Sequence, residues 1–371
     1  KDYKEAFSAY KNVNMMYASK ALCTLATSAI LADEGFGFDV VSAGEMYTVY
    51  KAGADMKKVL FNGNNKSISE LTLALELGVG RISVDNFLEL SLLNVLAKSM
   101  NKTAEILLRI TPGIECHTHE YIQTGHLDSK FGFDLTQIDE AVNLILDEYS
   151  NLTLRGLHAH IGSQIFETKV YHDEIEILVK ELARLDEKFG LKLDEINIGG
   201  GLGVKYTESD CPPSTYEIAC VIIESLNSSV QKYGIGYPTL FIEPGRSIIS
   251  TAGVTLYTIG SSKQVPNGKK YFAVDGGMAD NARPSMYKAE YTASVANKPD
   301  AETSQSVTIA GRFCESGDIL IHNIELPELE EGDILCVYNT GAYNYSMASN
   351  YNRVQKPAMV LVNNSQSDII I

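Results

Sequence analysis

The sequence predicts an α/β protein, in which a (β/α)8 TIM barrel is followed by a second, mainly β domain. Eight short apolar segments rich in β-branched residues alternate with segments of helical periodicity over residues 13–243. After Gly253 the alternation ends, and strand-like runs such as VTLYTIG, SQSVTIAG and GDILCVYNTG follow one another with turn residues between them. We therefore expect the barrel to span residues 1–252 and the β-rich C-terminal domain residues 253–371.

The barrel is predicted from the number and regularity of its strands. The eight expected strands are Val13–Ser19, Phe38–Ser42, Val59–Asn62, Ile82–Asp85, Ile106–Thr111, Leu154–His160, Glu195–Ile198 and Leu240–Glu243. Between them lie segments such as SISELTLALELG and YHDEIEILVKELARLDEKFG, whose apolar residues recur at three- and four-residue spacing. A doubly wound open sheet is the alternative, but the even strand count and the length favour a closed barrel.

Composition excludes several classes of partner. The formal charge of −16 leaves no basic excess with which to bind a phosphate backbone, so we expect no nucleic-acid partner. We also expect no membrane partner, because no apolar run approaches membrane-spanning length and no signal-like segment opens the chain. The six cysteines form no C-x-x-C pair, which is typical of reduced thiols in a cytoplasmic protein.

Polar residues that suggest chemistry stand at the carboxyl ends of the predicted strands, which form the functional face of a barrel. They are Lys20 after the first strand, His160 at the end of the sixth, Gly199–Gly201 after the seventh and Glu243 at the end of the eighth. Each alone has an ordinary explanation: a solvated lysine, a buried core histidine, a tight glycine turn. Their common position at one rim favours a binding site.

The kinds of residue at this rim fit one cofactor. Loops after strands seven and eight of barrels commonly hold a phosphate, and Ser163 after strand six adds a hydroxyl donor. A lysine across the rim can form an imine with an aldehyde. Phosphate and aldehyde together describe pyridoxal 5′-phosphate. The carboxylate of Glu243 would favour a protonated pyridine nitrogen, which makes the ring a strong electron sink.

The chain also resembles a known family, the fold-type III pyridoxal-phosphate decarboxylases. The blocks that carry the resemblance are YASKA (17–21), FDVVSAGEM (38–46), NGNNKS (62–67), TGHLDSKFGF (124–133), HIGSQI (160–165), NIGGGLG (197–203), EPGR (243–246), DGGMADNARPSMY (275–287), CESGD (314–318) and GAYNYSM (341–347). Within this family the chain is most similar to the enzymes that convert meso-2,6-diaminopimelate to L-lysine and carbon dioxide. This carboxy-lyase reaction is the last step of lysine biosynthesis.

The resemblance implies a role for each matching residue. Lys20 would be the Schiff-base lysine and His160 would stack on the cofactor ring. The other cofactor contacts would be Ser163, Gly199, Gly200, Gly201, Glu243, Pro244, Gly245, Arg246 and Tyr343. The substrate would be bound by Arg246, Arg283, Tyr287, Glu315 and Tyr343, with Glu315 recognising the distal ammonium. Cys314 would be the proton donor. Cys314 and Glu315 would come from the partner subunit of a homodimer.

Several alternatives remain open from the sequence. A related decarboxylase for another basic amino acid or for carboxynorspermidine has the same fold, but ornithine-type enzymes carry an aspartate after the cysteine where this chain has Glu315. A racemase would have an arginine in place of Glu243. A non-catalytic regulator of this fold loses cofactor contacts, whereas Lys20 and EPGR are present here. We expect no metal: HTHE (117–120) is a weak candidate without a third distant ligand.

Overall fold

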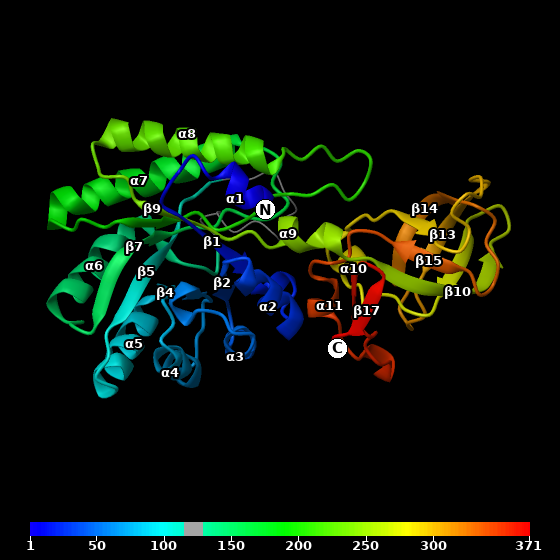
Figure 1. Cartoon of the computed structure of the whole chain (residues 1–371), viewed down its shortest axis with the longest axis horizontal. Helices are drawn as coiled ribbons and strands as arrows, with labels where there is room; N and C mark the ends of the chain where they lie inside the picture. Colours follow the sequence, from blue (N-terminus) through cyan, green and yellow to red (C-terminus); the bar gives the residue numbers. More distant parts are fainter. Residues whose placement is uncertain (115–128) are drawn as a thin grey trace. The chain divides into compact units, whose positions relative to one another are not determined.

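The computed structural model describes residues 1–114 and 129–371. The chain forms two compact units (Figure 1). The first consists of Lys1–Gly203 and Pro212–Gly245, and the second of Val204–Cys211 and Arg246–Ile371. The second unit thus begins at Arg246 rather than at residue 253, and it takes in a short segment from within the first unit.

The first unit is a closed parallel barrel, as predicted. Its strands are β1 (Val13–Ala18), β2 (Gly37–Val40), β3 (Val59–Phe61), β4 (Arg81–Val84), β5 (Ala104–Thr111), β7 (Leu152–His158), β8 (Glu195–Asn197) and β9 (Thr239–Ile242). They follow the order β4-β3-β2-β1-β9-β8-β7-β5, and the pairing of β4 with β5 closes the ring. The two-residue strand β6 (Phe133–Asp134) extends the edge of β5. Because all eight barrel strands are parallel, their carboxyl ends meet at one rim.

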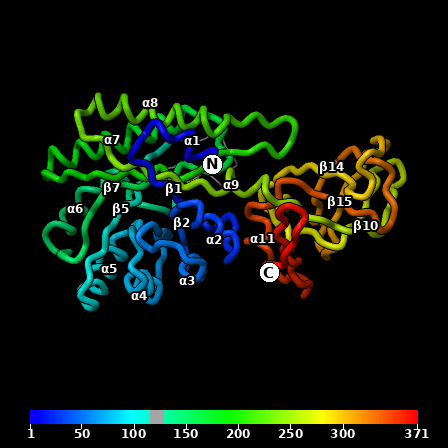
Figure 2. Tube along the Cα trace, viewed as in Figure 1, coloured from blue at the N-terminus to red at the C-terminus, as the bar shows by residue number. Residues whose placement is uncertain are grey.

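Helices cover the outside of the barrel strands (Figure 1), and the tube in Figure 2 follows this strand–helix alternation along the chain. They are α1 (Asp2–Ala6), α2 (Leu25–Asp33), α3 (Ala43–Lys51), α4 (Ile68–Leu77), α5 (Phe87–Ser99), α6 (Ile138–Asp147), α7 (Lys169–Phe189) and α8 (Thr215–Tyr233). Capping residues set several ends. Ser67 and Ser214 begin α4 and α8 with capping boxes, and left-handed Gly78 and Gly234 end them. In the described part of the chain, no helix is long and apolar enough to cross a membrane.

Apolar side chains fill the barrel because its strands are covered on both sides. Strands β2 and β3 are buried at every position, which explains why they appear in the sequence as nearly continuous apolar runs. Inside the barrel, Met16, Leu60, Leu107 and Phe241 pack together from four different strands. This apolar layer leaves the carboxyl ends of the strands to the polar side chains.

The second unit is built mainly of strands, as predicted. They are β10 (Thr255–Gln264), β11 (Lys270–Val274), β12 (Ala293–Val295), β13 (Gln305–Ala310), β14 (Ile319–Leu326) and β15 (Ile334–Val337), in the sheet order β12-β15-β10-β11-β13-β14. Strands β16 (Val360–Asn363) and β17 (Gln366–Ile369) form a separate hairpin. The unit also contains short helices α9 (Arg246–Ile249), α10 (Arg283–Tyr287) and α11 (Asn344–Met347). Val204 and Tyr206 are buried in its apolar core, which is why segment 204–211 belongs to this unit.

Candidate active site

Four groups singled out in the sequence lie at the same rim of the barrel. Lys20 stands in a 3-10 turn (Ser19–Ala21) directly after β1, and His160 follows β7. The backbone N–H of Gly200 donates to His160 Nδ1 at 3.3 Å. Glu243 N–H donates to Gly199 O at 2.6 Å, which ties the end of β9 to the glycine turn after β8. The positive charge of Lys20 acts on both His160 and Glu243. The structure therefore brings these four groups together.

The triple glycine allows close approach of three strand ends. A Cβ at Gly200 would lie 2.1 Å from the carbonyl oxygen of Glu243, and one at Gly201 would lie 2.6 Å from Gly162 O. Gly201 also has φ +103°, a conformation that favours glycine. The N–H groups of Gly201 and Gly245 donate no hydrogen bond to any residue in the described ranges. Such N–H groups at the ends of neighbouring strands are suited to an anionic oxygen.

Glu243 is buried at the rim, and two side chains lie against its carboxyl group. The side chain of Asn197 donates to Glu243 Oε1 at 2.7 Å, and His158 Nε2 lies 3.6 Å from the same oxygen. Burial, followed by the negative charge of Asp39, raises the pKa of Glu243 to about 8. A positively charged ring nitrogen beside this carboxyl would favour its ionised form. The residue is thus suited to sharing a proton with a pyridine ring.

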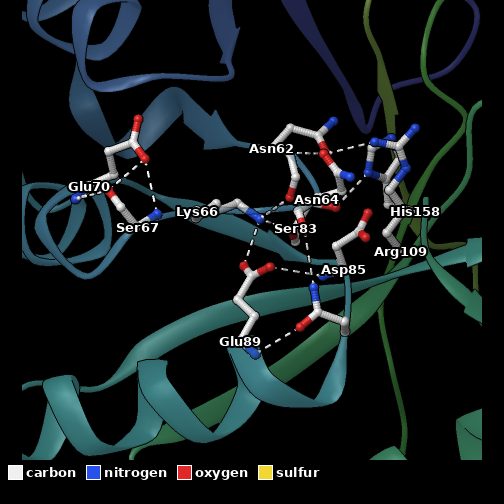
Figure 3. A network of polar contacts seen from close by, with 12 residues as sticks. Asn62, Asn64, Lys66, Ser67, Glu70, Ser83, Asp85, Glu89, Arg109 and His158 are labelled. Atoms are coloured by element: carbon white, nitrogen blue, oxygen red, sulfur yellow. Dashed lines mark hydrogen bonds and ion pairs between the residues drawn. The ribbon is translucent and has the colours of Figure 1, made fainter. Parts of the chain in front are cut away.

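Buried polar residues that the sequence analysis did not single out surround this site. Asp39 on β2 lies close enough to Lys20 and Arg109 to interact with their charges, and burial raises its pKa against them. Arg109 on β5 donates to Asn62 Oδ1 at 3.1 Å (Figure 3). Asp39 and Asn62 lie within the motif blocks FDVVSAGEM and NGNNKS, so those motifs were the available signal.

Next to these residues is a buried ion pair. Lys66 Nζ lies 2.6 Å from Glu89 Oε1, with 1% and 4% of the two side chains exposed. Lys66 also donates to the carbonyl oxygens of Gly63 and Ser83, at 2.8 and 2.7 Å (Figure 3). All three ammonium hydrogens therefore have acceptors. This arrangement fixes the loop after β3 to the end of β4.

The second unit contains two buried arginines that share an aromatic ring. Arg246 Nη1 donates to Tyr206 Oη at 2.8 Å, and the guanidinium of Arg283 lies 4.9 Å from the centre of the same ring. Arg246 also lies 4.7 Å from the centre of the Tyr343 ring. Burial acts to raise the pKa of Tyr206, but the charges of Arg246 and Arg283 outweigh it, so the pKa is lowered. Two oriented guanidinium groups of this kind can bind a carboxylate.

The remaining predicted residues of this unit lie on α10 and on the turn after β13. Tyr287 ends α10 and is half-buried, whereas Cys314 and Glu315 are exposed. Tyr351 donates a hydrogen bond to Glu315. The turn itself is held by Asp318, whose carboxylate accepts from the N–H groups of Phe313 and Met278 at 2.8 and 2.7 Å. Cys314 and Glu315 are thus presented outward by an anchored turn.

Comparison with known proteins shows the family. Residues 1–250 match the pyridoxal binding domain of the pyridoxal-dependent decarboxylases. The chain belongs to this family. The decarboxylase is 46% identical to the diaminopimelate decarboxylase of Bacillus subtilis (strain 168), over 100% of this chain and 85% of that protein. It is 49% identical to the diaminopimelate decarboxylase of Synechocystis, over 100% of this chain and 80% of that protein.

Solved structures agree with this assignment. The diaminopimelate decarboxylase of M. jannaschii matches the decarboxylase with a TM-score of 0.93 at 34% identity, over 100% of this chain and 85% of that one. A second structure of that protein is a complex with L-lysine. The resemblance stated from the motif blocks is confirmed, and so are the barrel with its β domain and the pyridoxal phosphate cofactor.

The residues at the barrel rim fit this cofactor chemically. The rim offers an amine at Lys20 for the aldehyde, N–H groups at Gly201 and Gly245 for the phosphate, and a buried carboxyl at Glu243 for the ring nitrogen. The chemistry of these three donors and acceptors matches the three polar ends of the cofactor. The roles assigned to individual residues remain predictions.

Two stretches of interest fall outside the described residues. They are HTHE (117–120) and the first part of TGHLDSKFGF, residues 124–128. Within residues 1–114 and 129–371, no group of three or more His, Cys, Asp or Glu side chains is arranged to hold a metal ion.

Proposed function

We propose that the decarboxylase converts meso-2,6-diaminopimelate to L-lysine and carbon dioxide with pyridoxal phosphate. The observation that carries the proposal is the position of buried Glu243, held by Asn197 at the rim that also presents Lys20. A carboxylate at the ring nitrogen suits decarboxylation, because it strengthens the electron sink that the reaction needs. The diaminopimelate decarboxylases that are 46% and 49% identical support this substrate.

The barrel residues would bind and orient the cofactor. When bound, the cofactor supplies an electron sink conjugated to the α-carbon of the substrate. Lys20 would hold it covalently, and His160 would lie against its ring. Burial, with the charges of Lys20 and Arg109, lowers the pKa of His160 well below its ordinary value, so that the imidazole stays neutral. Ser163, the three glycines and the Pro244–Arg246 backbone would bind the phosphate.

The second unit would supply the groups that bind substrate. Diaminopimelate carries an amino-acid group at each end, so the end that does not react needs partners for both a carboxylate and an ammonium. Arg246, Arg283 and Tyr287 would bind the carboxylate and Glu315 the ammonium. Tyr343, which stacks against Arg246, would contact both phosphate and substrate.

The reaction breaks the bond between the α-carbon and one carboxylate, and its electron pair stays with the α-carbon. Carbon dioxide leaves, and a proton must then be delivered to the α-carbon to give L-lysine. We assign this proton to the exposed thiol of Cys314. The proton is replaced from solvent in each turnover, so atoms and charges balance.

We further infer a homodimer in which each chain lends Cys314 and Glu315 to its partner's site. Both residues are exposed in one chain, as an intermolecular role requires. Inactive Lys20→Ala and Cys314→Ala proteins should then recover activity when mixed, because each mixed dimer contains one site without either substitution. No recovery after demonstrated subunit exchange would contradict the shared site.

The five described cysteines are free, which supports a cytoplasmic location.

The proposed reaction is tested by product analysis. The purified full chain, loaded with pyridoxal phosphate, is incubated separately with meso-diaminopimelate, L-ornithine, L-arginine and carboxynorspermidine. We expect L-lysine and carbon dioxide in equal amounts from the first substrate and little turnover of the others. Preferred turnover of ornithine, arginine or carboxynorspermidine would overturn the proposal.

A further inference from the structure

A buried serine–histidine pair lies behind Glu243. His158 ends β7, and its side chain is fully buried. Its Nδ1 lies 2.7 Å from Ser83 Oγ on β4, and its Nε2 lies 3.6 Å from Glu243 Oε1. Figure 3 shows Ser83 next to Lys66, and His158 on the side of Arg109. The proposed function assigns no role to Ser83 or His158.

The surroundings of the pair determine where the imidazole hydrogen lies. Burial, followed by the charge of Arg109, lowers the pKa of His158 well below its ordinary value, so the ring is neutral and carries one hydrogen. The Ser83 hydroxyl has no other hydrogen-bond partner in the described ranges, and Ser83 is fully buried. If Nδ1 carried the hydrogen, the hydroxyl hydrogen would be buried without an acceptor, which costs free energy. With the hydrogen on Nε2, Ser83 donates to Nδ1 and the Nε2–H faces the carboxylate of Glu243, which attracts it, so this tautomer is favoured.

That hydrogen faces Glu243. His158 Nε2 has no hydrogen-bond partner among the described residues. The separation of 3.6 Å is longer than a hydrogen bond, so the N–H acts on the carboxylate as a nearby dipole. Such a dipole favours the ionised carboxylate, whereas burial and Asp39 favour the neutral form. Ser83 is itself held in place, because its carbonyl oxygen accepts from Lys66.

We propose that Ser83 and His158 form a second support for Glu243, beside Asn197, and keep it ionised against the ring nitrogen of the cofactor. His158 is then a positioning residue, which acts through Glu243. The proposal rests on the proposed function, in which Glu243 meets that nitrogen.

The test measures binding of two cofactors to the apoenzyme. One is pyridoxal phosphate, and the other is its 1-deaza analogue, in which a C–H group replaces the ring nitrogen. We expect His158→Leu to weaken binding of pyridoxal phosphate by about tenfold or more, because Glu243 loses the dipole that favours its ionised form. Binding of the analogue should stay within about twofold, since it has no nitrogen for Glu243 to meet.

Two further variants separate positioning from packing. In His158→Gln, the amide oxygen can accept from Ser83 while the amide N–H faces Glu243, so most of the affinity for pyridoxal phosphate should return. Ser83→Ala removes the donor that fixes the hydrogen on Nε2, and we expect a smaller loss that again spares the analogue.

The chain contains a matched control outside the site. His172 on α7 has Nδ1 3.0 Å from Ser225 Oγ and Nε2 3.7 Å from Glu176 Oε2, with 43% of its side chain exposed. The same three residue types are thus arranged at similar distances, but here the imidazole and the carboxylate are partly exposed. His172→Leu should change the affinity for neither cofactor.

The outcomes are distinct. An equal loss of both cofactors in His158→Leu and Ser83→Ala, or no loss of either, overturns the positioning role. If His158→Leu does not fold, the other two variants still test the proposal. The positioning role is wrong if Ser83→Ala binds pyridoxal phosphate as tightly as wild type does. It is also wrong if His158→Gln weakens the binding of both cofactors equally. Failure of the wild-type apoenzyme to bind pyridoxal phosphate would instead contradict the proposed function.

Discussion

Asn197 joins Glu243 to the glycine turn. Its side-chain amide donates to Glu243 Oε1 at 2.7 Å, and its side-chain oxygen accepts from the N–H of Gly199 at 2.8 Å. Asn197 is completely buried at the end of β8. One side chain therefore fixes the group proposed for the ring nitrogen and the turn proposed for the phosphate.

Asn197→Ala should weaken both ends of this arrangement. It removes a hydrogen bond to a carboxylate and leaves the Gly199 N–H without its acceptor, so we expect binding of pyridoxal phosphate to weaken by roughly 10- to 100-fold. Fluorescence titration of the apoenzyme measures this. A dissociation constant within about twofold of wild type would show that Asn197 does not position the cofactor site.

The second prediction concerns the arginines. Tyr206→Phe removes the hydroxyl that accepts from Arg246, while the ring beside Arg283 remains. We expect KM for diaminopimelate to rise roughly tenfold, with a smaller change in kcat, because a carboxylate-binding group loses its orientation. Tyr338→Phe is the control, since Tyr338 is exposed and contacts Ser294. A fall in kcat with an unchanged KM would place Tyr206 outside substrate binding.

The ion pair between Lys66 and Glu89 is predicted to matter for stability. Glu89→Ala would leave a buried ammonium without its counter-charge, at a cost of about 3–5 kcal/mol of unfolding free energy. The double variant Lys66→Met/Glu89→Leu should be less destabilised than Glu89→Ala, because no unpaired charge remains. Urea denaturation measures both. A double variant that is less stable than Glu89→Ala would contradict this explanation.

Glu174 predicts a pH dependence of stability. This residue on α7 is fully buried, and its carboxyl oxygens have no hydrogen-bond partner in the described part of the chain. Burial, followed by the charge of Glu243, raises the pKa of Glu174 well above its ordinary value. In the unfolded chain the carboxyl ionises at its ordinary pKa, while in the folded chain it keeps its proton. The contribution of Glu174 to the free energy of unfolding is therefore largest at low pH. It decreases as the pH rises above that ordinary value.

Glu174→Leu should accordingly stabilise the protein, by an increment that grows between about pH 5 and pH 8. Glu181→Leu is the matched control on the same helix, because Glu181 is paired with Arg184 at 2.8 Å. Its substitution should give no such growing increment. A Glu174→Leu increment that is constant or shrinks as pH rises would show that the carboxyl is ionised in the folded protein.

The sequence predicted the barrel because parallel strands buried on both sides, such as β2 and β3, appear as continuous apolar runs. Lys20 and Glu243 could be placed at the rim because they follow such runs directly. The supporting residues were missed for a physical reason. His158 and Ser83 are 75 positions apart and meet only when the barrel closes, so no local pattern reveals the contact.

The division of the chain was harder to predict for a similar reason. Segment 204–211 lies between two barrel elements in the sequence, yet Val204 and Tyr206 are buried in the core of the second unit. The end of the strand–helix alternation in the sequence marks where a long series of strands begins. It does not reveal a short segment within the barrel sequence whose apolar residues pack against strands much later in the chain.

Lys20 is proposed to hold the cofactor at the barrel rim, and locating the covalent bond tests this directly. The wild-type protein, loaded with pyridoxal phosphate, is reduced with borohydride, digested and analysed by mass spectrometry. We expect the reduced cofactor on the peptide that contains Lys20, and no labelled peptide from Lys20→Ala. Attachment to a different lysine in the wild-type protein would show that Lys20 is not the lysine that holds the cofactor.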